Sequence, residues 1–450
     1  KSEFTCFHLH SDERYFMGMK TYGILALNTT NNSHELYVPN TSFQNEFHAL
    51  TITSDGYLAA VTQLGLTIIK NGLNYNLLSY PGFKNYPKYH EQSHYINQNL
   101  LYKPGTHIPM SIIEKDNGNL FFGNSGLSPK EDSYPYPGVV ELNLSNYNLT
   151  TFDSTDAVID GFWGIYNEAV TNYMVINQIE KDDNGNIWVT NPFCEKYGNM
   201  IAIQSKDDGA WSHIQIPDEN SYRPQTIALD NANRAWVGFA YESLGDKIYS
   251  SGGIKVLKYS SLNFADEDDS TWLSITNPEF LPGGSSDASV WSIIFDKMNY
   301  LWILNERGIR SFEGYTYNRL NKTITLDPFT VPDQDGDAIP YDFLSHISYA
   351  KGNRIRVDSQ NNKWIITHQG VWVTEDGINF WPSEEGLHPD NSGLLSDIVY
   401  DVAFDNDKGL AYLATEKGIS ILQIPFADNP GKKQSMYLSP NPFILPDDER

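Results

Sequence analysis

The sequence predicts an all-β protein built from repeated four-stranded units, and three features of the 450-residue chain support this prediction. The first is composition, since 13% of the residues are aromatic, only 19% are charged, and Gly, Asn and Pro are plentiful. The second is that no helix-length stretch places apolar residues every three to four positions. The third is a motif that recurs along the chain. An apolar content of 40% is sufficient for a large core.

The recurring motif joins two apolar runs through an acidic turn and places an aromatic residue in the second run. Its clearest copies read IEKDDNGNIWVTN, IALDNANRAWVGF, IIFDKMNYLWILN and IRVDSQNNKWIIT. Asp, Asn and Gly tolerate the left-handed backbone of a tight turn, so each copy predicts a β-hairpin. In each copy an Asp precedes a Trp by six positions: Asp182 and Trp188, Asp230 and Trp236, Asp296 and Trp302, Asp358 and Trp364.

Weaker copies extend the motif to eight units, and several copies add a third apolar run that begins at a glycine, as at Gly308 and Gly370. A fourth strand is expected from the variable stretch before the next copy. Four-stranded units at this period are blades of a β-propeller, so residues 1–425 are predicted to form a propeller of seven or eight blades. Eight units can form eight blades, seven blades plus one unit of a preceding propeller, or a ring with one blade shared by both chain ends. The units are marked by Asp12, Asp55, Asp116, Asp182, Asp230, Asp296, Asp358 and Asp405.

The aromatic residues fall into two groups by their place in the repeat. We expect Trp188, Trp236, Trp302 and Trp364 to fill the gaps between neighbouring sheets, because a large flat side chain suits that space. Other aromatic residues lie in the connections between copies and are better candidates for contact with a ligand. These are Trp163, Trp211, Trp272, Tyr134 and Tyr136.

The charge balance narrows the range of partners. The chain has 31 Lys and Arg against 56 Asp and Glu, a net charge of -25, which disfavours nucleic acid and anionic membrane surfaces. No stretch approaches the ~18 consecutive apolar residues of a membrane span. The two cysteines, Cys6 and Cys194, are expected to be buried thiols and not a disulfide framework. The absence of an initiator Met and of a hydrophobic leader at Lys1 favours a processed or partial chain.

The motif resembles the two-component-regulator propeller repeat of surface and periplasmic proteins in Bacteroidota. That repeat usually reads Asp-x-x-Gly-x-(Leu/Ile)-Trp-(Val/Ile)-Gly-Thr and continues into a Gly-led apolar strand. Trp236, Val237 and Gly238 match it closely, whereas Trp302 and Trp364 match at the aromatic but lack the following Gly-Thr. The resemblance extends from about residue 4 to residue 424 and implies a propeller fold.

The tail carries a second resemblance. MYLSPNPF, Met436–Phe443, is similar to the beginning of the C-terminal sorting module of type IX secretion substrates. This similarity implies that residues 426–450 contain a linker and the truncated start of a C-terminal β-sandwich module. Propellers followed by such a module resemble a surface component of the type IX attachment complex, which is associated with delivering anionic lipopolysaccharide to the sortase.

Together these resemblances imply a non-enzymatic propeller at the cell surface or outside the cell. The expected role is binding of protein or glycan partners, among them secretion-system components, in association with type IX secretion as component or cargo. One alternative is the oligosaccharide-sensing ectodomain of a hybrid two-component receptor, which predicts a membrane segment and a kinase after the propeller. Another is a carbohydrate-active propeller enzyme, whose acids come from different blades and leave no local motif.

Two polar strings are expected to be solvated loops, although the first also matches a metal-binding pattern. HEQSH, His90–His94, spells the zinc-protease pattern, which needs both histidines on one helix face and Glu91 as general base. Turn-forming residues such as Pro81 and Pro87 surround it, which favours a solvated polar loop. The acidic string Ala265–Ser270 is likewise expected to be a solvated loop.

A structural calcium site is predicted in the connection before the seventh unit. Asp333, Asp335 and Asp337 alternate around a Gly, and Asp342 follows five positions later. Alternating carboxylates allow one tight loop to place several oxygens around a hard cation. The string resembles the calcium loops of thrombospondin type 3 repeats but departs from them at Tyr341, where another Asp is usual. The simpler interpretation is an acidic surface turn.

Overall fold

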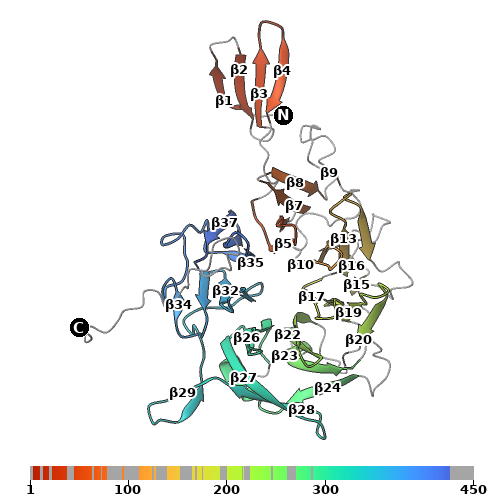
Figure 1. Cartoon of the computed structure of the whole chain (residues 1–450), viewed down its shortest axis with the longest axis vertical. Coiled ribbons are helices and arrows are strands. Elements are labelled where there is room, and N and C mark those ends of the chain that lie inside the picture. Colours follow the sequence, from red (N-terminus) through yellow and green to blue (C-terminus); the bar gives the residue numbers. More distant parts are fainter. Residues whose placement is uncertain are drawn as a thin grey trace, which may run out of the picture.

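Seven groups of antiparallel strands follow one another around a central axis in the computed structural model of the chain (Figure 1). We number these groups as blades 1 to 7 in chain order, and blades 4 and 5 are joined in one eight-stranded sheet. The structure describes residues 4–10, 14–19, 23–37, 45–62, 65–71, 73–78, 94–95, 111–123, 126–127, 139–152, 165–167, 170–174, 176–192, 200–214, 216, 223–244, 247–260, 270–284 and 287–425. The predicted all-β propeller fold is confirmed.

Each blade is an antiparallel sheet whose strands follow the chain from the axis outward. Blade 1 contains β5 (Ala49–Ile52), β6 (Leu58–Thr62), β7 (Gly65–Lys70), β8 (Leu73–Leu78) and a short parallel strand, β9 (His94–Tyr95). Blade 2 contains β10 (Ile112–Glu114), β11 (Leu120–Gly123), β13 (Val139–Leu142) and β14 (Leu149–Phe152). Blade 3 contains β17 (Ile179–Lys181), β18 (Ile187–Thr190), β19 (Ile201–Gln204) and β20 (Trp211–Ile214).

Blades 4 to 7 continue the same pattern. Blade 4 contains β21 (Pro224–Asp230), β22 (Arg234–Leu244), β23 (Lys247–Tyr259) and β24 (Ser270–Ile275). Blade 5 contains β25 (Val290–Phe295), β26 (Leu301–Asn305), β27 (Gly308–Asn318) and β28 (Thr323–Pro328), and β28 pairs in parallel with β24. Blade 6 contains β31 (Arg354–Val357), β32 (Lys363–Thr367), β33 (Gly370–Thr374) and β34 (Phe380–Trp381). Blade 7 contains β35 (Val399–Asp405), β36 (Leu410–Thr415) and β37 (Gly418–Gln423).

The ring closes by contact between its first and last blades. The innermost strand of each blade lies beside the innermost strand of the next, in the order β5, β10, β17, β21, β25, β31 and β35. β35 then lies against β5, so the two strands that meet at the closure are far apart in the sequence. Closure of the ring protects the inner strand edges, which an open sheet would expose.

Several elements lie beside the ring sheets. β1 (Phe4–Leu9), β2 (Arg14–Met19), β3 (Gly23–Asn28) and β4 (Ser33–Tyr37) form a sheet that stands apart from the ring (Figure 1). β12 (Gly126–Leu127), β15 (Ile165–Asn167) and β16 (Val170–Met174) form a three-stranded sheet, and β29 (Thr330–Pro332) pairs with β30 (Ala338–Pro340). η2 (Pro278–Phe280) and η3 (Pro282–Gly284) are single 3-10 turns. No described helix has the length and apolar character needed to cross a membrane.

Seven of the eight predicted units thus form the ring, and the first unit corresponds to the separate β1–β4 sheet. The ring thus has seven blades with one further unit, and the assignment of that unit to a preceding propeller stays a prediction. Cys6 of β1 is exposed, contrary to the expected buried thiol, because no neighbouring blade covers that sheet. Cys194 and residues 426–450, the predicted linker and C-terminal module, lie outside the described residues.

The predicted hairpin turns are present and are held by the motif aspartates. One carboxylate oxygen of Asp182, Asp230 and Asp358 accepts hydrogen bonds from the backbone N–H groups two and four positions ahead. The other oxygen accepts the indole N–H of the paired tryptophan, at 3.2, 3.0 and 3.0 Å respectively. Gly185 and Asn233 occupy the positive-φ positions of their turns, with φ of 86° and 54°. Each Asp therefore fixes both a turn and the orientation of an indole ring.

The motif tryptophans lie between blades, as predicted. Each packs in a cluster with apolar side chains of the following blade, as Trp236 does with Val290 and Ile293 of β25. The indole rings therefore form an outer layer of contacts that supplements the contacts between innermost strands. Trp188, Trp236 and Trp364 are 0% exposed and Trp302 is 2% exposed.

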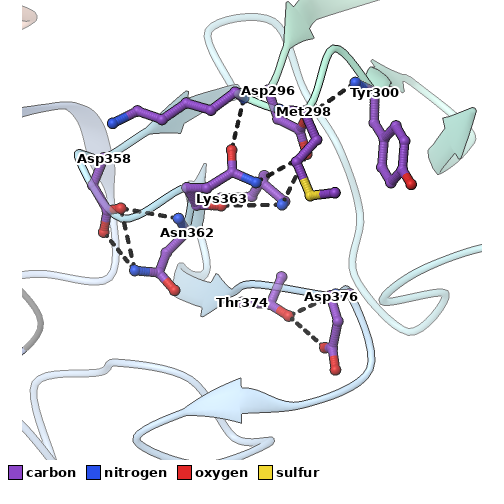
Figure 2. Close-up of polar contacts among 11 residues, drawn as sticks. Asp296, Met298, Tyr300, Asp358, Asn362, Lys363, Thr374 and Asp376 are labelled. Atoms are coloured by element: carbon purple, nitrogen blue, oxygen red, sulfur yellow. Dashed lines mark hydrogen bonds and ion pairs between the residues drawn. The ribbon is translucent and has the colours of Figure 1, made fainter. Parts of the chain in front are cut away.

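Blade 5 departs from the Asp–Trp arrangement because a lysine from blade 6 takes the carboxylate oxygen (Figure 2). Lys363 is 2% exposed, and its Nζ lies 3.0 Å from Asp296 Oδ2. The same ammonium group lies 5.1 Å from the centre of the Trp302 ring. The Trp302 indole N–H is left without a hydrogen-bond partner among the described residues. Lys363 thus replaces a bond within blade 5 with a bond between blades 5 and 6.

This difference predicts unequal effects for two matched substitutions. Trp236→Phe and Trp302→Phe both shorten a buried indole, but only Trp236→Phe removes a donor from a carboxylate. We expect Trp236→Phe to lower the free energy of unfolding by about 1–2 kcal/mol more than Trp302→Phe, measured by urea denaturation. Trp236→Ala should cost about 3–5 kcal/mol, and a loss below about 1 kcal/mol would contradict its burial between blades.

Candidate binding site in the central channel

Side chains on the innermost strands bond each blade to the next. At five of the seven seams, among the described residues, a side-chain oxygen accepts a hydrogen bond from a backbone N–H of the next innermost strand, at 3.0–3.2 Å. All five acceptors occupy the same place in the repeat, directly before the apolar residue that begins each copy of the motif: Ile112, Ile179, Ile227, Ile293 and Val402. The acceptor and donor pairs are Ser111 and Ile179, Gln178 and Ile227, Thr226 and Ile293, Ser292 and Ile355, and Asp401 and Leu50.

The other two seams have Ala49 and Arg354 at the acceptor position, and neither side chain can accept a hydrogen bond. Arg354 lies at the seam between blades 6 and 7, next to the seam where the ring closes. Its Nη1 lies 3.4 Å from Asp401 Oδ2, so an ion pair occupies the seam where other blades use a neutral oxygen.

Asp401 joins three blades. Its carboxylate accepts the Leu50 N–H of blade 1 at 3.0 Å and the Arg356 Nε–H of blade 6 at 3.0 Å. The residue is 0% exposed. Burial alone would raise the pKa of Asp401, but the charges of Arg356 and Arg354 outweigh it and the pKa is lowered. Asp401 is therefore a charged group at the point where the ring closes.

Glu180 of β17 adds a second carboxylate to the channel. Gln178 Nε2 donates to Glu180 Oε1 at 2.5 Å and to the Ile227 carbonyl at 3.1 Å, which ties this carboxylate to the seam between blades 3 and 4. Burial raises the pKa of Glu180, although the charge of Arg356 acts in the opposite direction. Two arginines and two carboxylates thus share the channel.

A cavity of about 50 Å³ lies among these side chains and is bordered by five of the seven blades. Such a volume accommodates a few water molecules or one small polar group. A wider space of about 450 Å³ is bordered by Leu50, Ile52 and Phe404, and Arg356 borders both spaces. The lining of the small cavity includes Gln178, Glu180, Trp291, Asn353, Arg354 and Arg356. We call this small cavity the channel pocket.

His48 lies at the closure seam, near the same charges. It is 3% exposed, and its ring centre is 4.5 Å from that of Tyr400. Burial, together with the positive charge of Arg354, lowers the pKa of His48 to about 3. The neutral imidazole is therefore the form that the folded ring accommodates.

This shift predicts acid sensitivity at the closure seam. In the unfolded chain His48 has a pKa of ~6.5 and binds a proton more readily than in the folded chain. Protonation therefore favours unfolding, so the contribution of neutral His48 to the free energy of unfolding is complete above ~pH 6.5 and is lost as the pH falls toward 3. When the pH is lowered from 7 to 5, we expect the free energy of unfolding of the wild type to fall by roughly 1–2 kcal/mol more than that of His48→Gln. The exposed His34→Gln variant serves as control. Identical pH profiles for wild type and His48→Gln would refute this account.

The structure places three of the predicted calcium ligands in one turn. Asp333 Oδ1 accepts the N–H groups of Asp335 and Asp337 at 2.9 and 2.8 Å, in the turn between β29 and β30. Asp342 holds Arg310 instead, through Nε at 2.6 Å and Nη2 at 2.9 Å. Within the described ranges, no three His, Cys, Asp or Glu side chains are grouped so that they could hold a metal ion. Calcium binding at this turn stays a prediction.

Calcium would have to draw the three turn carboxylates together without Asp342, whose charge Arg310 already neutralises. We then expect millimolar calcium to raise the melting temperature of wild type relative to EDTA, and to leave Asp335→Ala unchanged. If the wild type melts at the same temperature in both conditions and elemental analysis finds no calcium, the calcium prediction is contradicted and the string is an acidic surface turn.

The aromatic candidates from the connections between copies do not line the channel pocket among the described residues. Trp211 and Trp272, the described candidates for contact with a ligand, lie on the outer strands β20 and β24 and are partly buried against blade cores, so ligand contact by them stays a prediction. Trp211, for example, has its ring centre 6.2 Å from that of Phe121. Trp163, Tyr134 and Tyr136 lie outside the described residues.

The two polar strings are only partly described. His94 of the HEQSH string begins β9, and residues 90–93 lie outside the described part of the chain. Residues 265–269 of the acidic string also lie outside it, and Ser270 begins β24. The zinc interpretation and both loop interpretations therefore stay predictions.

Comparison with known proteins shows likeness at the level of fold. No family model and no curated protein matches the chain. PorZ, a surface component of the type IX secretion system of Porphyromonas gingivalis, matches 92% of this chain with a TM-score of 0.63 and 17% identity. The chain shares the PorZ propeller fold. It spans about half of the PorZ chain, 51%, and the predicted resemblance in layout is confirmed at the level of fold.

Two further solved structures match with lower scores. The extracellular domain of the putative hybrid two-component system BT3049 from B. thetaiotaomicron matches 94% of this chain and 51% of its own, with a TM-score of 0.49 and 13% identity. Virginiamycin B lyase from Staphylococcus aureus matches 84% of this chain and 94% of its own, with a TM-score of 0.48 and 13% identity.

Proposed function

We propose that this chain is the propeller of a non-enzymatic, extracellular or cell-surface protein that binds protein or glycan partners and is associated with type IX secretion as component or cargo. The observation that carries the proposal is the fold likeness to PorZ over 92% of the chain. PorZ is a bacterial surface component of that secretion system, and the shared fold makes the same setting the first one to test here.

The tail of the sequence supports the same setting. The string SPNPF at Ser439–Phe443 is similar to the beginning of a type IX sorting module. The charge of the chain adds a constraint on partners, since a net charge of -25 favours neutral or basic surfaces over acidic ones. Protein partners with basic patches and neutral glycans are therefore the first candidates.

Gene deletion in a type IX-competent bacterium that carries the gene tests the association. If the protein is a component, deletion should reduce the surface display of an unrelated cargo that has its own sorting module, and a plasmid copy should restore it. If the protein is cargo, inactivating the secretion system should remove it from the surface, while its own deletion leaves other cargo unaffected. No change in either experiment would contradict the association with type IX secretion.

A separate assay tests the non-enzymatic part of the proposal. The purified chain is incubated with a panel of polysaccharides and new reducing ends are measured over time. We expect no release above that of heat-denatured protein. Release that is lost on denaturation would favour a carbohydrate-active enzyme, and its pH profile would then identify the acid and base involved.

A further inference from the structure

Two buried N–H donors in the channel have no acceptor among the described residues. Asn353 is 1% exposed, and its Nδ2 has no hydrogen-bond partner, although its Oδ1 accepts the Ala350 N–H at 2.7 Å. The indole N–H of Trp291 is also buried without a partner. A buried donor without an acceptor costs about 1–3 kcal/mol, and native proteins contain few of them. Both residues line the channel pocket, so a group bound there is a candidate acceptor for these donors.

The charges around the pocket indicate the sign of such a group. Its lining has three charged residues, Arg354, Arg356 and Glu180, so two guanidinium groups face one carboxylate and disfavour a cation. The carboxylate of Asp401 is engaged by both arginines and by the Leu50 N–H. The lining therefore combines the N–H donors of Asn353 and Trp291, which have no acceptor among the described residues, with two guanidinium charges. The pocket is therefore rich in donors and suited to an oxygen ligand with negative charge.

We propose that the channel pocket binds a carboxylate group, carried by a free organic acid or by an acidic sugar. One or both carboxylate oxygens accept hydrogen bonds from Asn353 Nδ2 and Trp291 Nε1, and Arg354 and Arg356 supply the compensating charge. This site lies inside the ring, so it goes beyond the surface binding proposed above and does not depend on it.

The dimensions of the two spaces limit the ligand. About 50 Å³ accommodates a carboxylate and little more, so the group enters as the end of a molecule. The wider space of about 450 Å³ shares Arg356 with the pocket and has Leu50, Ile52 and Phe404 on its walls.

Calorimetric titration of the whole chain tests the proposal. Sodium acetate and sodium D-glucuronate are the probes, and sodium chloride and D-glucose at matched ionic strength are the controls. We expect saturable binding of at least one carboxylate and none of glucose. Acetate binding identifies a free acid as sufficient, whereas binding of glucuronate alone identifies a sugar acid. Equal binding of glucose and glucuronate, or no saturable binding of either carboxylate, would overturn the proposal.

Three conservative variants assign the binding to the pocket. Trp291→Phe keeps the ring and removes the N–H, and should weaken binding about tenfold, as the loss of one bond to a charged group does. Asn353→Asp keeps the acceptor for Ala350 and replaces the donor with a negative charge, which should abolish binding. Trp302→Phe removes an unpartnered indole N–H between blades 5 and 6 and should leave the affinity unchanged. Wild-type affinity in the folded Trp291→Phe and Asn353→Asp variants would exclude the pocket as the site.

Discussion

The ring closes around one buried carboxylate. Asp401 accepts a backbone N–H from blade 1 and pairs with two arginines of blade 6, so blades 6, 7 and 1 meet at its oxygens. An unpaired carboxylate in this position would be costly, so Arg354 and Arg356 are needed to keep the closure intact. The same two guanidinium groups line the channel pocket. The chemistry of the channel is thus a consequence of the way in which the ring is closed.

Two layers of contacts hold neighbouring blades together, and both depart from the repeat at blade 6. In the inner layer, Arg354 stands where five other blades have a Ser, Thr, Gln or Asp acceptor and blade 1 has Ala49. In the outer layer, Lys363 reaches Asp296 of the preceding blade and displaces the indole of Trp302. A repeat that needs only stability can use the same residue in every copy, so departures from it indicate where a protein carries specific properties. In this ring the inner departure, Arg354, lines the channel pocket.

The sequence predicted those parts of the structure that depend on neighbouring residues. The Asp–Trp spacing predicted the hairpins and the burial of the tryptophans, because turn and indole belong to one motif. The channel could not be predicted in the same way, since Glu180, Arg354 and Asp401 come from different blades and each looks like an ordinary strand residue. A signal was nevertheless present in the polar residue before the first apolar position of most copies. The expectation for Cys6 was wrong because burial depends on which sheet stands beside a strand.

Native-state hydrogen exchange of Asp401→Asn measures the central claim most directly. The substitution keeps the size of the side chain and an oxygen that can accept the Leu50 N–H, and it removes the charge that pairs with the arginines. We predict faster exchange of the Leu50 amide and its neighbours in β5 and β35, with the Ile293 amide at the seam between blades 4 and 5 unchanged. Unchanged protection of Leu50, or an equal loss of protection at both seams, would contradict closure of the ring by this carboxylate.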